Sequence, residues 1–210
     1  MRVIIDMDGT IADFTTASFA KVEELYGIKM TKKDAYKPKT AQLVWERMTE
    51  EQKSKYNDHR ELYSEICDKG FFLKMKPFPG AIEQVKRIAN TGAEICFVTK
   101  TLNWDRCPPE KDLWLKKYFP NIKYYLLMVD SVHSKQCIEA DFIIDDDPRV
   151  LADINGPIPI MMKQPWNKNI RGVYPFEVNN MEEAANIVLQ YKETLRWWDE
   201  RGMENETKID

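Results

Sequence analysis

The sequence is poor in the residues that build several common kinds of site. It contains only two histidines and four cysteines among 210 residues. His59 and His133 lie far apart in the chain, which argues against a histidine metal pair and against a catalytic triad. No two cysteines have the spacing of zinc ligands, so we expect reduced thiols, with Cys96 in a buried strand.

Long apolar runs and a large net charge are also missing. No stretch is long enough to cross a bilayer, and a strand pattern begins almost at residue 1, so we expect neither a membrane span nor a signal peptide. The net charge of -3 gives no electrostatic footprint for duplex nucleic acid, which favours a small anion over a nucleic acid polymer as ligand. Together with the reduced cysteines, these absences predict a cytoplasmic protein with no membrane partner.

What the chain does have is a short apolar run that ends in acidic residues. Val3, Ile4 and Ile5 are followed by Asp6, and Asp8 stands two positions further on. This pattern predicts a buried parallel strand with two carboxylates at its carboxyl end, where open α/β sheets place their ligands. Two carboxylates so close repel each other, so one must be protonated or a cation must neutralise the pair. Both outcomes suit phosphoryl transfer, whereas the alternative is an Asp-rich turn or helix cap.

Later strand patterns also end in polar side chains. Residues 141–144 predict a strand that ends in Asp145 and Asp146. Thr99 follows another predicted strand, residues 93–98, and a hydroxyl group at that place can donate a hydrogen bond to a phosphate oxygen. The alternatives are a solvated acidic loop for the first pattern and an ordinary strand end for the second.

Several motifs resemble one superfamily of phosphohydrolases. Asp6-Met-Asp-Gly-Thr10 resembles the first motif of the haloacid dehalogenase-like phosphohydrolases, and the next four residues are similar to the 5′(3′)-deoxyribonucleotidases of that superfamily. Residues 71–81 and 107–114 resemble the same family, the first through paired aromatics before a Pro-x-Pro-Gly-Ala helix start, the second through a Cys-Pro-x-Glu-Lys entry. Lys135 precedes Asp145 by ten positions, which is the spacing of the third and fourth motifs.

The resemblance implies a reaction and a role for each of these site residues. Asp6 would be the nucleophile and Asp8 the general acid and base, while Thr99 and Lys135 would hold the phosphate. The ligands of a Mg²⁺ ion would be Asp6, the backbone carbonyl of Asp8, Asp145 and Asp146. The implied reaction is hydrolysis of a nucleoside monophosphate to nucleoside and phosphate through a phospho-aspartyl intermediate.

The resemblance also implies contacts to the rest of the substrate. Phe14 would stack beside the base or sugar, with core packing as its alternative, and Tyr36 would help to close the pocket. The second motif continues with Lys100 and Thr101, which we predict as substrate contacts, with solvent exposure as the alternative for Lys100. Lys111 lies in the first turn of a predicted helix, where a cation opposes the macrodipole. We therefore expect an anionic partner and count Lys111 among the substrate contacts, with a solvated side chain as the alternative.

The order of predicted elements indicates an α/β fold. By resemblance it is a haloacid dehalogenase-like Rossmannoid parallel sheet with a small helical cap inserted after the first strand. No strand pattern appears between Asp13 and Gly70, which favours a lid over the carboxylates, with a larger core as the alternative. We therefore expect the core at residues 1–14 and 76–210 and the cap at residues 15–75.

Finer expectations follow from local patterns. Residues 15–26 predict a helix that ends at Gly27, and Thr40 or Thr49 is expected to cap a later helix. The Pro-Trp-Asn loop at residues 165–167 is expected to pack behind the site without a chemical role. Strands are expected at residues 93–98, 122–129, 141–144 and 157–162, and helices at residues 81–90, 110–119 and 181–198.

Three functions remain open at this point. The first is the nucleotidase, and the second is a phosphatase for another small phosphate ester, such as a sugar phosphate or phosphoglycolate. The third is a binding protein without turnover. The joint presence of five site residues argues against it: Asp6, Asp8, Thr99, Lys135 and Asp145. The oligomeric state is open too, with a homodimer as one alternative.

Overall fold

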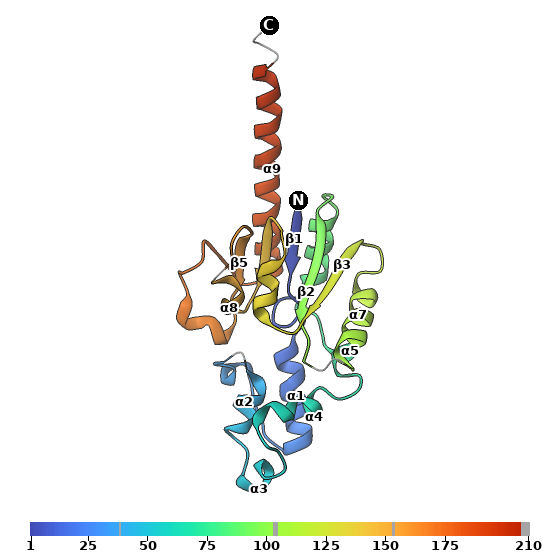
Figure 1. The fold of residues 1–210 in the computed structure, drawn as a ribbon, viewed down its shortest axis with the longest axis vertical. Helices are drawn as coiled ribbons and strands as arrows, with labels where there is room; N and C mark the ends of the chain where they lie inside the picture. The colour runs from blue at the N-terminus through green and yellow to red at the C-terminus, as the bar shows by residue number, and fades with distance from the viewer. Residues whose placement is uncertain (38, 103–104, 153, 207–210) are drawn as a thin grey trace.

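A parallel sheet forms the centre of the computed structural model, which describes residues 1–206 except 38, 103–104 and 153. All neighbouring strands run parallel, in the order β3-β2-β1-β4-β5-β6. The strands are β1 (Arg2–Ile5), β2 (Glu94–Lys100), β3 (Tyr124–Val129), β4 (Phe142–Asp145), β5 (Ile158–Met162) and β6 (Phe176–Val178). The first strand of the chain therefore lies in the middle of the sheet, between β2 and β4 (Figure 1).

The strands are apolar because both faces of the sheet are covered. Val3 and Ile5 are fully buried in the core on one face, and Ile4 is fully buried on the other. Continuous apolar runs of this kind are typical of parallel strands with helices on both sides. The first face carries α6 (Ala81–Ala89), α7 (Cys107–Tyr118) and α9 (Met181–Glu206), and the second carries the 3₁₀ helix η3 (Val132–Cys137) and α8 (Pro148–Leu151).

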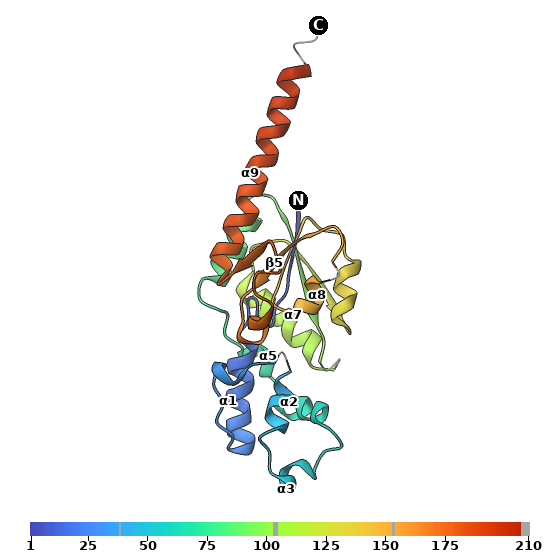
Figure 2. The same cartoon turned by 90° about the vertical axis from the view of Figure 1, so that its left-hand side faces the viewer.

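The helices that follow β1 extend beyond the carboxyl edge of the sheet. In both views α1 to α4 form a separate group on that side (Figures 1 and 2). Asp13 caps α1 by accepting a hydrogen bond from the Thr16 backbone N–H at 3.2 Å, and Gly27 ends it with a φ of 68°. The segment contains α1 (Phe14–Tyr26), η1 (Lys32–Asp34), α2 (Thr40–Trp45), α3 (Glu50–Lys53), η2 (His59–Glu61), α4 (Leu62–Ile66) and α5 (Phe71–Lys74).

Helix α7 fixes the point at which this helical segment returns to the sheet. The buried carboxylate of Glu110 accepts hydrogen bonds from the backbone N–H groups of Gly70, at 2.6 Å, and Phe72, at 3.1 Å. The Trp114 indole donates to the Met75 carbonyl at 2.9 Å. Because these bonds are largely shielded from water, they hold α5 against the core.

Most of the predicted elements are confirmed, and the exceptions have local causes. The helix at residues 15–26 is α1, and Thr49 caps α3 by accepting from the Gln52 N–H at 3.2 Å. The expectation for Thr40 is wrong, because Thr40 is the first residue inside α2 and the capping position is Lys39. Strand β6 was not predicted, since three residues are too few to show a period. Strands β2 to β5 all match predicted strands.

The boundary between core and cap stays a proposal. We keep residues 1–14 and 76–210 as the core and residues 15–75 as the cap. Within these ranges, residues 38, 103–104, 153 and 207–210 lie outside the described residues. In the described part of the chain, no helix is both long and apolar enough to cross a membrane.

Candidate active site

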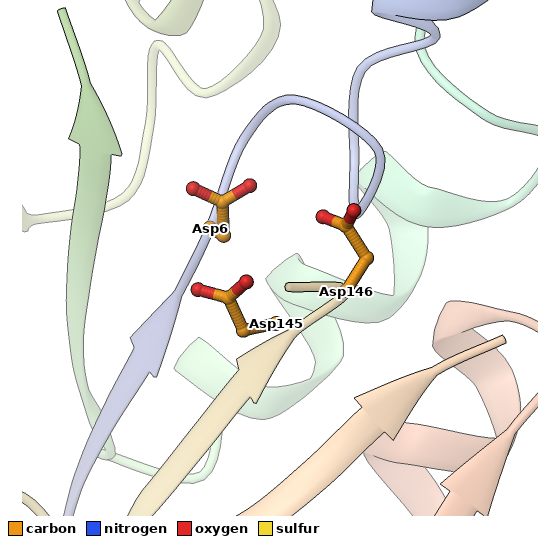
Figure 3. A group of neighbouring side chains, drawn as sticks. All are labelled: Asp6, Asp145 and Asp146. Atoms are coloured by element: carbon orange, nitrogen blue, oxygen red, sulfur yellow. The ribbon is translucent and has the colours of Figure 1, made fainter. Parts of the chain in front are cut away.

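The two acidic strand ends meet at the carboxyl edge of the sheet. Because β1 and β4 are parallel neighbours, Asp6 and the pair Asp145 and Asp146 leave the sheet side by side, and the Asp6 N–H donates to the Ile144 carbonyl at 3.0 Å. Carboxylate oxygens of the three aspartates lie within 4.8 Å of one another. Figure 3 shows these carboxylates gathered at the ends of the two strands. The convergence expected from the sequence is therefore present.

The turn after β1 is shaped to fit against Asp146. Gly9 has a φ of +90°, and a Cβ atom there would lie 2.8 Å from the Asp146 carboxylate. The Thr10 hydroxyl donates to the same carboxylate at 3.3 Å. Only glycine combines this backbone conformation with so close an approach.

Lys135 joins the two strand ends from the 3₁₀ helix η3. Its ammonium group donates to Asp6 Oδ1 at 2.5 Å and to Asp145 Oδ2 at 2.7 Å, and the residue is 2% exposed. Burial acts to lower the pKa of Lys135, but the Asp145 and Asp6 carboxylates outweigh burial and raise it above the ordinary value. Lys135 therefore remains a cation inside the site.

The remaining charge of the site is negative. Burial raises the pKa of Asp6 to about 7, against the attraction of Lys135. Burial likewise raises the pKa of Asp145, and it raises that of Asp146 together with the nearby Asp145 carboxylate. Three buried carboxylates share one ammonium group, so a bound cation would relieve their repulsion. An oxygen-only set of donors suits a hard divalent ion such as Mg²⁺, and the residues present therefore fit the metal.

Asp8 and Thr99 are linked by a second buried lysine. The ammonium group of Lys111, on α7, donates to Asp8 Oδ2 at 2.6 Å, to Thr99 Oγ1 at 2.6 Å and to the Lys100 carbonyl at 3.1 Å. Lys111 is fully buried and does not line the cavity described next. The anionic partner of Lys111 in the structure is thus Asp8, and its expected contact with the substrate stays a prediction.

A cavity of about 300 Å³ opens over these groups. We call its sheet side the floor and its helical side the cap wall. The floor consists of Asp6, Asp8, Gly9, Lys100, Leu102, Val132, Lys135, Asp145, Asp146, Asp147, Arg149 and Trp166. The cap wall consists of Phe14, Thr15, Ala35, Lys37, Lys39, Thr40, His59, Arg60 and Tyr63.

The predicted substrate contacts fall in different places. Phe14 and Lys100 line the cavity, and Phe14 also packs edge-on against Phe71 with ring centroids 5.5 Å apart. Thr101 is 6% exposed and is not part of the lining. Tyr36 is 51% exposed and lies outside the lining, because its hydroxyl donates to Glu46 at 2.5 Å.

The Pro-Trp-Asn loop does more than pack behind the site, which corrects our expectation. The Trp166 indole lines the floor and donates to Asp146 Oδ2 at 2.8 Å. Asn167 donates to the Asp146 carbonyl at 3.0 Å, and Gln164 donates to the Gly9 carbonyl at 2.6 Å. The sequence placed this loop after a predicted strand, but only the structure shows that this strand, β5, lies beside β4.

Several cations of the cavity were also missed. Arg149 lies on the floor, where its guanidinium pairs with Asp147. Lys37, Lys39 and Arg60 lie on the cap wall. Isolated basic residues in a polar helical segment give no sequence signal, because most of them face solvent.

The comparisons with known proteins agree with this geometry. A family model described as "5' nucleotidase, deoxy (Pyrimidine), cytosolic type C protein" matches residues 1–194. A Homo sapiens protein named 5'(3')-deoxyribonucleotidase, mitochondrial, is 32% identical over 168 residues. That match covers 76% of this chain and 66% of the human protein, so the chain spans just under two thirds of the length of this relative.

Solved structures show the same fold at low identity. A predicted phosphatase from Clostridium acetobutylicum matches with a TM-score of 0.60 at 14% identity, over 90% of this chain and 98% of that chain. A dehalogenase solved with an intermediate complex matches with a TM-score of 0.53 at 12% identity, over 89% of this chain and 96% of that chain.

Proposed function

Because the chain belongs to the family of 5' nucleotidase, deoxy (Pyrimidine), cytosolic type C proteins, a family of phosphatases, we propose that it hydrolyses nucleoside monophosphates to nucleoside and inorganic phosphate. The fold is the Rossmann-like α/β fold of the haloacid dehalogenase-like hydrolases. The human relative is named as a deoxyribonucleotidase, which favours deoxyribonucleotides among the substrates. Its name also places it in mitochondria, so a cytoplasmic location for this chain stays a prediction.

One observation carries the proposal. Asp6, Asp145 and Asp146 converge beside Lys135 on the floor of a cavity into which Asp8 also faces. A nucleophilic carboxylate, a second carboxylate and a fixed cation are the groups that phosphoryl transfer to an aspartate requires. A protein that only bound a phosphate ester would not need the second carboxylate at the turn.

In the first proposed step the Asp6 carboxylate attacks phosphorus. A bond forms between an Asp6 oxygen and phosphorus, while the bond from phosphorus to the nucleoside oxygen breaks. Asp8 gives a proton to the departing oxygen, so the nucleoside leaves as a neutral alcohol. Lys135 stays within reach of both Asp6 and the phosphoryl oxygens and stabilises their charge.

In the second proposed step water attacks the phosphorus of the phospho-aspartyl group. Asp8, now a carboxylate, takes a proton from the water, and the acyl phosphate bond breaks to return Asp6 and release phosphate. The Thr99 hydroxyl accepts a hydrogen bond from Lys111, and Thr99 is fully buried and does not line the cavity, so its expected contact with a phosphoryl oxygen stays a prediction. Each step therefore uses groups that the sheet already holds together.

The carboxylates of Asp6, Asp145 and Asp146, with the backbone carbonyl of Asp8, would hold a Mg²⁺ ion. When bound, such an ion neutralises the acidic floor and polarises a phosphoryl oxygen. Trp166 and Thr10 would orient Asp146 by the hydrogen bonds described above. The test of the metal is activity and thermal stability with MgCl₂ and with EDTA.

The substrate class is tested by a panel. Phosphate release is measured with MgCl₂ on deoxyribo- and ribonucleoside 5′- and 3′-monophosphates, a sugar phosphate and phosphoglycolate. We expect the highest kcat/KM for a nucleotide. A higher kcat/KM for the sugar phosphate or phosphoglycolate would support a phosphatase function but reject the nucleotidase function.

The intermediate is tested by acid quenching with ³²P-labelled substrate. We expect a phosphorylated protein that is labile to alkali in the native chain and none in Asp6→Asn. Asp112→Asn is the matched control, because Asp112 is a partly exposed carboxylate on α7 that pairs with Lys116 outside the cavity. Equal turnover in Asp6→Asn and the native chain would reject the mechanism.

A further inference from the structure

Strand β3 is the outermost strand on one side of the sheet, and part of it is uncovered. Figure 1 shows it at that side, and within the described part of the chain no strand pairs with its outer edge. Tyr125 is 45% exposed and Leu127 is 37% exposed. Tyr125 pairs in register with Cys96 and Leu127 with Val98, which are buried in the core of the second face. Two large apolar side chains are therefore exposed on a face that is covered over the central strands.

The cause is the short connection from β3 to β4. Residues 130–141 contain only η3, a 3₁₀ helix of six residues, which is about 12 Å long. The connection must pass over β2 and β1 to reach β4, a distance of three strand spacings or about 14 Å. Val129, at the carboxyl end of β3, packs against the buried cluster of this face, but Tyr125 and Leu127 do not. The helix thus crosses the sheet without running back along β3.

The outer edge of β3 has none of the usual features that block the addition of a strand. Its sequence is Tyr-Tyr-Leu-Leu-Met-Val, with neither a charged residue nor a proline. The Val129 carbonyl accepts a hydrogen bond from the Thr101 N–H at 2.8 Å, so the peptide groups of Val129 face β2. Because these groups alternate along a strand, those of Tyr124, Leu126 and Met128 point to the outer edge. Their N–H and C=O groups can bond to another strand.

Charges of opposite sign flank β3. Lys123 precedes the strand and Asp130 follows it, and neither forms an ion pair with a described residue. An added strand of the same sequence that runs antiparallel brings Lys123 of each copy close to Asp130 of the other, whereas a parallel strand brings like charges together. The opposite edge strand, β6, has only three residues and contains Glu177, so that edge is blocked in the usual way.

A hollow at the amino end of β3 has room for the end of such a strand. Its volume is about 340 Å³, and its lining includes Lys123, Tyr125 and Glu94. The Glu94 carboxylate already pairs with Arg2 at 3.0 Å. The Lys123 ammonium group in this lining is therefore available to Asp130 of an antiparallel strand.

From these features we propose that two copies of the chain associate edge to edge through β3, antiparallel, so that two six-stranded sheets join into one. The two-fold axis passes beside Leu126, whose N–H and C=O groups bond to those of the other Leu126. On the second face, Tyr125 of each copy packs against Leu127 of the other. The caps extend beyond the carboxyl edge of the sheet, so in an antiparallel pair they point in opposite directions and do not collide (Figure 1). This association does not depend on the proposed function.

The first test is the mass in solution, measured by analytical ultracentrifugation over roughly 1 to 100 µM, where specific dimers of moderate affinity dissociate. We expect the native chain to reach twice its mass of 24.8 kDa. Leu127→Lys should raise the dissociation constant at least about 100-fold, since each dimer carries the change twice. Val173→Lys is the control: Val173 is 67% exposed and lies outside β3, so the dimer should be kept. A native chain that stays monomeric, or an unchanged dissociation constant in Leu127→Lys, overturns the proposal.

The second test exchanges the flanking charges, which leaves the apolar residues of β3 in place. Lys123→Asp alone and Asp130→Lys alone each place like charges at both ends of the pair, so each should weaken the dimer about tenfold. An equimolar mixture of the two variants places opposite charges at both ends, and should dimerise within about threefold of the native affinity. Recovery in the mixture supports the antiparallel pairing of β3. A mixture that dimerises no better than either variant alone overturns it.

Thermal melts of all variants accompany both tests. Because Leu127, Lys123 and Asp130 are all at least partly exposed, we expect each variant to fold. If Leu127→Lys melts at a clearly lower temperature than the native chain, Tyr125→Lys replaces it, since that residue is more exposed and meets the same contact. The native dissociation constant in a folded Tyr125→Lys would likewise overturn the proposal.

Discussion

The floor and the cap wall of the cavity are built in opposite ways. On the floor, Asp145 is 1% exposed and Lys135 is 2% exposed, and both stand at or beside the ends of central strands. The cap wall comes from short helices, of which α2 has six residues, and its basic side chains are partly or fully exposed. The acidic residues and Lys135 are therefore fixed by the sheet, whereas the basic side chains of the cap wall are carried by short helical segments.

This difference has an energetic consequence. Burying three carboxylates opposes folding, and the hydrogen bonds from Lys135, Thr10 and Trp166 only partly offset that cost. Exposed ion pairs such as Lys37 with Glu46 add little either way, because water screens them. Changes on the floor should therefore have large effects on turnover, and changes in the cap should have small effects that are mainly on stability.

Loss of the nucleophile should have the largest effect. Asp6→Asn removes the attacking carboxylate but keeps the side-chain volume and reduces the repulsion on the floor, so we expect a folded protein whose kcat falls by at least about 10⁴-fold. Phosphate release and a thermal melt are measured together. A variant with more than a tenth of native turnover would show that the floor does not carry the chemistry.

Loss of one carboxylate beside the nucleophile should be next in size. We expect MgCl₂ to raise the Tm of the native chain by about 5 °C at saturation, because the ion binds only the folded floor. Asp146→Asn should lose most of that shift and lower kcat/KM by roughly 100-fold or more. An unchanged shift in Asp146→Asn would mean that the ion binds elsewhere.

A methyl group at Gly9 should damage the floor through sterics alone. Gly9→Ala forces a Cβ to within 2.8 Å of the Asp146 carboxylate at a φ of +90°, so the turn must move. We expect a loss of about 2 kcal/mol in the free energy of unfolding and a fall of at least about tenfold in kcat/KM. Gly80→Ala is the control: its φ is also positive, at 73°, but nothing lies within 4 Å of the added atom, so activity should be kept.

The sequence predicted the site best where a functional side chain directly follows a strand. An apolar run that ends in Asp6, and another that ends in Asp145, required only parallel pairing to meet. The partner of Lys111 was harder to predict. The position of Lys111 in the first turn of a helix indicates an anionic partner, but that this partner is Asp8 depends on how α7 packs against the sheet. The role of Trp166 depends on β5 lying beside β4, which no local pattern shows.

Trp166 therefore tests a part of the floor that the sequence did not reveal. Trp166→Phe keeps an aromatic side chain but leaves Asp146 Oδ2 without its indole donor. We expect kcat/KM to fall about tenfold and the Tm to fall by about 2 to 4 °C, since one hydrogen bond to a buried carboxylate is lost. Trp45→Phe, in the cap, is the control, because Trp45 packs against the core without lining the cavity. A larger kcat/KM loss in Trp45→Phe would contradict the division between floor and cap.

The smallest effect should come from a cap residue that acts only on its own helix. Thr49 holds the first turn of α3 through Gln52, whose side chain in turn accepts from the Thr49 N–H at 2.9 Å. Thr49→Ala should cost about 1 kcal/mol of helix stability and leave kcat/KM within about twofold.

If the cap unfolds together with the sheet, the cost appears in the global Tm. If the cap opens alone, amide exchange rises in α3 while the Tm stays unchanged, because local opening then lies below global unfolding in free energy. A tenfold loss of activity would instead place α3 among the elements that position the substrate, and the contrast between the floor and the cap would have to be abandoned.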